Sequence, residues 1–410
     1  MSDQSARHHA DAQQTARWRF AFGTLLTFSA TMATLAPFAI GVLGPFVVDE
    51  FELTNTSFGA LGTAFFAVAG FGSLVIAFGV DRVDPRTSFL ASFAISSLCL
   101  GLLAAAPNYA ALLGAMAIGG VGAALLHPVT NLLIRIHLPP GSRGLIMGLK
   151  QSGVQLGAAL AGAVLPVASR WLGWRWSLAA LAVPALLALF VARAVVPTSD
   201  RTTARSTAVR LGAAAASLRW LGPFALLMGF GASTFGMYVV RYAVEDLGID
   251  VAVAGFIATF AGVTSVISRI TWAAVAERVA TISAIMALLP VLAGGAIVLL
   301  ISADAAGPML VWAAAGLFGA SGTAWNGVAH LAIVSETPET QTGQASSYLQ
   351  VAFFAGLLSG PVAFGAILDR VASYGSAWST LIGAYVLAAA LAGSWFWHDR
   401  RDARTGALAT

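Results

Sequence analysis

The chain has very little charge and almost no cysteine. Charged residues make up only 10% of its 410 residues, whereas 58% are hydrophobic, and the mean hydropathy is +0.82. A soluble protein of this length needs far more charge to cover its surface. The single cysteine, Cys99, lies in an apolar run, which excludes a disulfide framework. The composition therefore predicts a membrane protein.

The hydrophobic residues occur in long blocks rather than in scattered stripes. Phe20–Val48, Phe58–Val80 and Thr281–Ile301 are examples, and each can cross about 30 Å of hydrocarbon at about 1.5 Å per residue. Twelve spans are expected, beginning near Phe20, Ser57, Thr87, Tyr109, Gly144, Trp176, Trp220, Ala252, Thr281, Met309, Gln344 and Ala377. We therefore predict an all-α membrane protein with twelve transmembrane helices in two pseudo-symmetric six-helix bundles.

The longest polar interruption predicts the domain organisation. Pro197–Leu218 is polar and basic, as expected for a linker between two halves. The predicted parts are a cytoplasmic N-terminal tail (1–19), an N-terminal six-helix bundle (20–197), a cytoplasmic linker (198–219), a C-terminal six-helix bundle (220–397) and a cytoplasmic C-terminal tail (398–410).

Arginines are unevenly distributed over the loops. With both termini on one side of the membrane, that side collects sixteen arginines and the other only four. Because cytoplasmic loops carry an excess of basic residues, we expect a multi-pass protein of the bacterial inner membrane with both termini in the cytoplasm. The first eighteen residues do not resemble a signal peptide. The net charge of +4 is spread over short loops, so no nucleic-acid partner is expected.

The two halves repeat one another. An offset of 199 residues maps Gly120 to Gly319, Pro139 to Pro338 and Gln151 to Gln350. An offset of 196 residues maps the loop after the second span onto the loop after the eighth. Internal duplication of a helical bundle is typical of secondary transporters, whose solute site lies between the repeats.

The loop after the second span carries a recognisable motif. It reads AFGVDRVDPR from Ala77 to Arg86, and its repeat reads RITWAAVAERV from Arg269 to Val279. The first segment resembles the signature loop of the major facilitator superfamily, although Ala77 and Asp84 stand where that loop usually has glycines. The resemblance implies two six-helix bundles around a central solute site. We predict that a gating latch, formed in only one transport state, comprises Asp81, Arg82, Arg86, Glu277 and Arg278. A solvated turn that merely ends the helix is the alternative.

The fifth span can be compared with the motif typical of the superfamily's antiporters. Its glycines fit the spacing of the superfamily's antiporter motif, but Ala158 replaces the proline of that motif. Met116 stands where antiporters carry an arginine in the fourth span. Glycines at these spacings also serve close helix packing. These departures disfavour a proton/drug antiporter.

Two cations lie inside predicted spans, whereas none of the 18 acidic residues does. Lys150 and Arg269 both fall in the cytoplasmic half of the membrane. A cation there costs about 2.5–3.5 kcal/mol on insertion scales, and the missing counter-charge could arrive as an anionic solute. Arg269 would bind a carboxylate through two parallel hydrogen bonds from its planar guanidinium, and Lys150 would attract it as a point charge. Snorkelling to the cytoplasm or bonding to backbone carbonyls is the alternative.

A polar pattern recurs in the fourth and tenth spans. His127 and Asn131 stand four residues apart in the fourth span. The offset of 199 residues maps His127 to Asn326 and Asn131 to His330, so the tenth span has the same two residue types in reversed order. We predict that these faces line the solute cavity, with interhelical hydrogen bonding as the alternative. A proton relay through the histidines is a weaker hypothesis. Further candidates for solute contact are Gln151, Gln155, Tyr238, Trp325, Tyr348 and Gln350.

The predicted function is secondary active transport of a small anionic solute, either an organic acid or an inorganic anion. Transport would proceed by alternating access, coupled to protons or to a counter-anion. The alternative is a proton-coupled multidrug exporter, which would need a membrane-embedded acid. The sequence has no nucleotide-binding loop and no catalytic or metal-ligand constellation, so we expect no enzyme activity, metal or cofactor. A monomer is expected.

Overall fold

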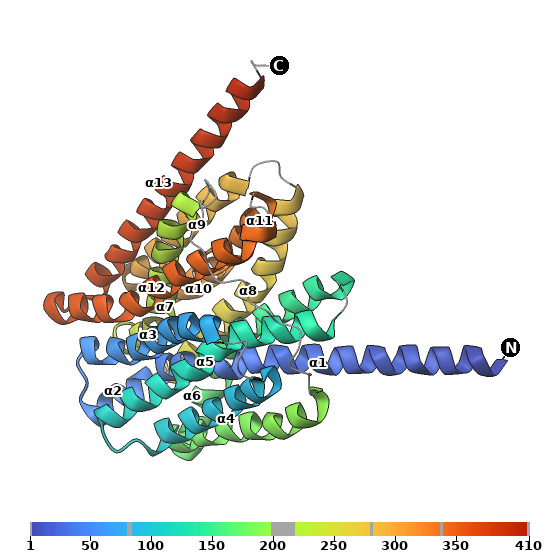
Figure 1. The fold of residues 1–410 in the computed structure, drawn as a ribbon. Coiled ribbons are helices and arrows are strands. Elements are labelled where there is room, and N and C mark those ends of the chain that lie inside the picture. Colours follow the sequence, from blue (N-terminus) through green and yellow to red (C-terminus); the bar gives the residue numbers. More distant parts are fainter. Residues whose placement is uncertain are drawn as a thin grey trace.

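The computed structural model describes the chain in six backbone segments. These cover residues 2–79, 84–138, 140–197, 218–278, 282–336 and 339–407. Their side chains are described except at 2–16, 74, 76–79, 127, 135, 140–145, 218, 273, 277–278, 334–336, 339–345, 347 and 402–407. Within these segments the chain forms helices joined by short turns and contains no strand (Figure 1). The prediction of an all-α protein is confirmed.

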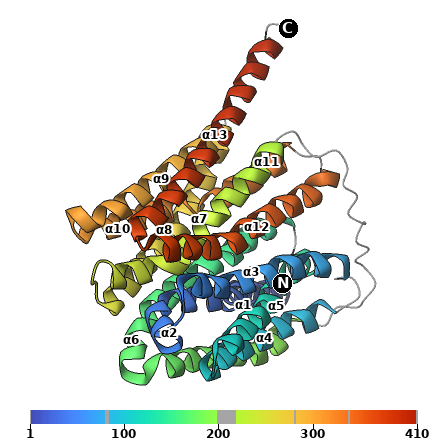
Figure 2. The ribbon, with the colours of Figure 1, turned by 90° about the vertical axis from the view of Figure 1, so that its left-hand side faces the viewer.

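The helices form two groups, which lie one above the other in Figure 2. The first group contains α1 (Ser2–Val42), α2 (Gly44–Phe51), α3 (Asn55–Gly79), α4 (Pro85–Ala105), α5 (Tyr109–His137) and α6 (Pro140–Val195). The second contains α7 (Leu218–Glu245), α8 (Val251–Arg278), α9 (Ile282–Ala306), α10 (Met309–Ser321), α11 (Trp325–Glu336), α12 (Glu339–Val371) and α13 (Tyr374–Ala407).

The helix bounds account for twelve spans. In the described residues, ten helical segments are long and apolar enough to cross a membrane. One of them, in α6, is 50 residues long and turns back at Gly173, whose φ of 77° interrupts the helix. It therefore holds two spans. The short α10 and α11 share another span, broken at residues 322–324. This confirms the predicted twelve-helix fold.

Polar caps define where two helices begin. Asp84, within the Ala77–Arg86 loop, accepts a hydrogen bond from the Thr87 backbone N–H (2.9 Å), and Pro85 follows it in the first turn of α4. Partial burial raises the pKa of Asp84, but its hydrogen bonds to Thr87 and the Arg86 charge outweigh burial and leave the pKa below its usual value. Asn108 caps α5 in the same way through the Ala111 N–H (2.9 Å). Such caps satisfy the free N–H groups of a first turn.

Packing around paired glycines shows the internal repeat. A Cβ atom on Gly120 would lie 2.5 Å from the Phe65 carbonyl oxygen of α3. A Cβ atom on Gly319 would lie 2.3 Å from the Ala261 oxygen of α8. The two glycines are 199 residues apart and the two carbonyls 196, which are the offsets found in the sequence. Both glycines therefore permit the same close helix contact in the two halves.

The two halves meet tightly at one end of the bundle. Twelve spans return the chain to the side on which it began, and we call this the terminus side and the opposite one the far side. On the far side, the Asp369 carboxylate of α12 accepts four hydrogen bonds from the first residues of α3. They come from the Asn55 N–H (2.9 Å) and amide (2.7 Å) and from the Thr56 N–H (2.8 Å) and hydroxyl (2.5 Å). Asp369 thus caps a helix of the other half.

Two further far-side contacts join the halves. Arg170 of α6 forms an ion pair with Asp250, which precedes α8. The Tyr238 hydroxyl of α7 donates to the Asn55 carbonyl oxygen at 2.7 Å. Together with the Asp369 cap, these contacts close the far side.

The described polar contacts on the terminus side join helices of the same half. Trp18 donates to the Val195 carbonyl (3.0 Å) in the first half, and Ser283 donates to Asp399 (2.7 Å) in the second. Arg86, one of the five predicted latch residues, donates to the Arg193 carbonyl of its own half. Asp81 and Arg82 lie outside the described residues, as do the side chains of Glu277 and Arg278. The latch therefore stays a prediction.

Candidate functional site

Arg269 of α8 connects the two halves near the middle of the bundle. Its guanidinium donates to the Gln151 carbonyl of α6 (3.3 Å) and to the Thr323 carbonyl in the break between α10 and α11 (3.2 Å). Its Nε atom is buried and has no hydrogen-bond partner among the described residues. The arginine bonds to backbone carbonyls, the sequence-based alternative to an anion, but keeps one donor free.

The break beside Arg269 is stabilised by neighbouring side chains of α8. Ser268 donates to the Gly319 carbonyl (3.0 Å), and Trp272 donates to the Ala320 carbonyl (2.8 Å). Arg269, on the same helix, donates to the Thr323 carbonyl. Interrupted membrane helices persist only where side chains or water satisfy the freed backbone groups. Side chains of α8 thus stabilise the interruption in the middle of the tenth span.

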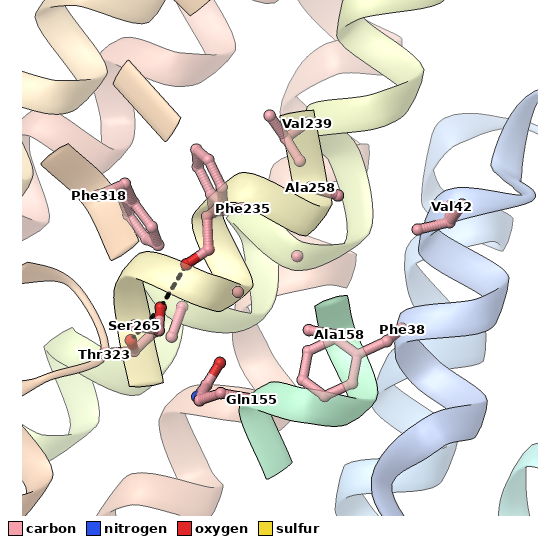
Figure 3. Close-up of a pocket in the computed structure, with 14 residues that line it drawn as sticks. Phe38, Val42, Gln155, Ala158, Phe235, Val239, Ala258, Ser265, Phe318 and Thr323 are labelled. Carbon is pink, nitrogen blue, oxygen red and sulfur yellow. Dashed lines mark hydrogen bonds between the residues drawn. The ribbon is translucent and has the colours of Figure 1, made fainter. Parts of the chain in front are cut away.

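A cavity of about 50 Å³ lies between the halves, one helical turn from Arg269 toward the far side (Figure 3). Gln155 of α6 projects its carboxamide into it from the first half, and Ser265 and Thr323 line it from the second. The Gln155 side chain is 7% exposed and has no hydrogen bond to the described residues. A buried amide without a partner is costly, so this amide is available to a ligand.

Aromatic rings form much of the remaining wall. Phe38 comes from α1, Phe235 from α7 and Phe318 from α10. The rings of Phe235 and Phe318 stack with centroids 3.8 Å apart and planes inclined by 9°. The sequence analysis did not single out these phenylalanines, because nothing distinguishes them from the other 21 of the chain's 24.

Lys150 lies inside the first half. It is 1% exposed, and its ammonium donates to Asn131 Oδ1 (2.6 Å) and Thr130 Oγ1 (3.1 Å) of α5. Both partners are neutral. The structure thus brings together two predicted site residues, the buried Lys150 and the exposed Asn131.

The polar faces of α5 and α11 lie on either side of this region. His330 is half-buried and experiences the positive charges of both Arg269 and Lys150, so the three groups are close enough to interact across the halves. Asn326 is half-buried in the first turn of α11. The His127 side chain lies outside the described residues.

The other predicted contact residues occupy varied positions. Tyr238 is fully buried in the far-side closure, where its hydroxyl also donates to the Pro361 carbonyl (3.1 Å). Trp325 is 1% exposed and packs against Phe224 and Phe353 within the second half. Tyr348 is 45% exposed and packs beside Gly222 of α7. Gln350 and the Gln151 side chain are half-buried.

The described acidic side chains lie at helix ends rather than beside this cavity. Those on the far side include Glu50, Glu245, Asp246, Asp250, Asp304 and Asp369, and those on the terminus side include Asp84 and Asp399. Within the described residues, no group of three His, Cys, Asp or Glu side chains could hold a metal ion. The described part of the central region thus offers cationic and neutral donors without a carboxylate.

Three known bacterial proteins resemble parts of this sequence. The hexuronate transporter of Bacillus subtilis is 23% identical over 149 residues, which cover 36% of this chain and 35% of that protein. The gentisate transporter of Corynebacterium glutamicum is 29% identical over 177 residues, covering 42% and 39%. The puromycin resistance protein pur8 of Streptomyces alboniger is 34% identical over 227 residues, covering 52% and 42%. The chain therefore spans little more than a third of the first two relatives.

Solved structures match the fold over most of its length. A D-xylose-proton symporter superposes with a TM-score of 0.79 at 16% identity, covering 92% of this chain and 97% of the other. A bacterial homologue of the human lysosomal transporter Spinster, inward-facing and occupied, gives a TM-score of 0.75 at 17% identity, covering 92% and 96%. The family model described as Major Facilitator Superfamily matches residues 24–336 and 223–409. The chain therefore belongs to the major facilitator superfamily, the family that the Ala77–Arg86 loop resembles.

Proposed function

We propose that this protein is a secondary transporter that moves a small organic anion across the bacterial inner membrane by alternating access. Arg269 is the observation that carries the proposal. Its guanidinium lies between the halves, and among the described residues it bonds only to neutral backbone oxygens and keeps Nε unpartnered. Because a buried cation without a counter-charge is unfavourable, an anion bound here would gain more than a neutral solute.

The relatives support an organic anion. Hexuronate and gentisate are both carboxylates, and the proteins named for transporting them match about two-fifths of this chain. Family membership supports alternating access around a central site. The arginine bias of sixteen to four favours a cytoplasmic terminus side. On that orientation, the described contacts correspond to a carrier closed toward the outside. We further propose that the carrier acts as a monomer and couples to protons or to a counter-anion.

A drug exporter is the second candidate. The similarity to the puromycin resistance protein, at 34% identity over 52% of the chain, favours it. An exporter of cationic drugs needs an acid inside the membrane to attract them. The described acids lie at helix ends, which supports the anion transporter over the exporter.

Uptake into liposomes tests the proposal. Purified protein should accumulate labelled gentisate or glucuronate but no cationic dye. Arg269→Gln should abolish uptake, and Arg269→Lys should lower it by at least about tenfold because the planar fork is lost. The matched control is Arg219→Gln, which removes an exposed arginine paired with His398 on the terminus side and should leave uptake intact. Uptake of cations alone, or normal anion uptake by Arg269→Gln, would refute the proposal.

A further inference from the structure

The central cavity has few hydrogen-bonding groups to offer. Of the 14 residues that line it, only Gln155, Ser265 and Thr323 carry polar side chains. The Thr323 hydroxyl donates to Ser265 Oγ (2.9 Å), and the Ser265 hydroxyl donates to the Ala261 carbonyl (2.7 Å). Both hydroxyl protons are therefore already used. The free side-chain donors that remain are the Gln155 amide and, one turn away, Arg269.

A sugar acid does not fit this wall. Each ring hydroxyl of such a solute loses its water on entry and needs a protein partner in return. The two engaged hydroxyls can only accept, and the rest of the wall is aliphatic or aromatic. One carboxylate, in contrast, would be satisfied by the Gln155 amide together with the Arg269 guanidinium.

Three phenylalanine rings, in contrast to this polar donor pair, form the aromatic part of the cavity wall. Phe38 reaches across from α1 to lie 3.7 Å from the position that a Cβ on Gly236 of α7 would take. It therefore stands where the two halves meet, across the cavity from the stacked Phe235–Phe318 pair (Figure 3). Aromatic rings attract a flat ring in stacked or edge-on geometry more than they attract a saturated one.

We propose that the transported anion is an aromatic carboxylate, whose ring lies among Phe38, Phe235 and Phe318 and whose carboxylate is held by Gln155 and Arg269. This inference rests on the proposed function and narrows its substrate class. The present cavity holds roughly three to five waters at about 10–15 Å³ each, which is less than an aromatic ring needs. We therefore expect binding to widen the cavity and to turn the Arg269 guanidinium from the Gln151 carbonyl toward the solute.

Calorimetric binding to the purified protein tests this inference with three acids: benzoate, cyclohexanecarboxylate and glucuronate. Benzoate should bind at least about tenfold more tightly than glucuronate, with cyclohexanecarboxylate between them. Glucuronate binding more tightly than benzoate, or no binding of any of the three, would overturn the inference. In the first case Arg269-dependent glucuronate uptake would leave the proposed function standing, whereas the absence of any anion uptake would refute that function itself.

Variants assign the contacts. Gln155→Leu should weaken benzoate binding by at least about tenfold, because the carboxylate loses a buried donor. Phe38→Leu should weaken benzoate more than cyclohexanecarboxylate. The control is Ser152→Ala on the same helix, whose hydroxyl donates only to the Gly148 carbonyl (3.1 Å) and whose loss should change neither. If Gln155→Leu does not fold, Gln155→Asn, which shortens the amide by one carbon, should show the same loss. Unchanged binding in the folded variants would contradict the assignment.

Discussion

At the scale of single residues, Lys150 shows how a charge can be buried without an acid. Its ammonium is held by Asn131 and Thr130, both neutral. The sequence predicted that Lys150 lies inside the membrane, in the cytoplasmic half. It did not predict the partner, since the distance between α5 and α6 depends on their packing and not on local spacing.

Lys150→Met separates a structural role from a transport role. Replacing a buried ion by an apolar side chain of similar length is commonly neutral or stabilising, so the melting temperature should stay the same or rise. Anion uptake should fall by at least about tenfold if the charge helps to attract the solute. Asn131→Ala is the comparison, and it should lower the melting temperature because it leaves the ammonium with one partner fewer. A lower melting temperature for Lys150→Met would indicate that the lysine stabilises the fold.

At the scale of helices, the break between α10 and α11 is the feature that the sequence did not predict. The segment Met309–Glu336 is apolar enough to be one continuous span, and it contains no proline. The interruption depends on donors from another helix, namely Ser268, Arg269 and Trp272. Only the tertiary structure brings these donors to the freed carbonyls. The spans follow from hydropathy and the repeat from residue spacing, both of which are local, and the family from the resemblance of the Ala77–Arg86 loop.

Trp272→Phe tests the contribution of α8 to this break. The phenyl ring keeps most of the packing but leaves the half-buried Ala320 carbonyl without its donor, at a cost of roughly 1–3 kcal/mol. The melting temperature should fall, and a thiol-reactive dye can follow the unfolding because Cys99, the only cysteine, is buried. Trp312→Phe is the control, since Trp312 packs against Phe260 and makes no hydrogen bond to the described residues. Equal melting temperatures for the two variants would mean that the break does not need the indole.

At the scale of the whole molecule, the far-side contacts join the two halves at one end of the bundle. Asp369 holds the first turn of α3 through four hydrogen bonds, and Arg170 pairs with Asp250 across the other helix contact. These bonds must break when the far side opens. In the proposed transport cycle, we expect these bonds to be balanced by the terminus-side latch predicted at Asp81, Arg82, Arg86, Glu277 and Arg278. A transporter needs both closures to be weak enough to exchange.

Asp369→Asn should shift this balance toward a structure open on the far side. The new amide would place N–H donors against the N–H and hydroxyl donors of Thr56, so charge-assisted bonds worth about 1.5–3 kcal/mol each are lost. The equilibrium should then move by at least about tenfold. Spin labels at Trp171 and Met309, which are 86% and 76% exposed on the far side of the two halves, would report it in a Cys99→Ala background. Longer distances should gain population in Asp369→Asn but not in Asp304→Asn, which alters an exposed acid on the same side. An unchanged distance distribution would mean that packing of α3 against α12, rather than the Asp369 cap, keeps the far side closed.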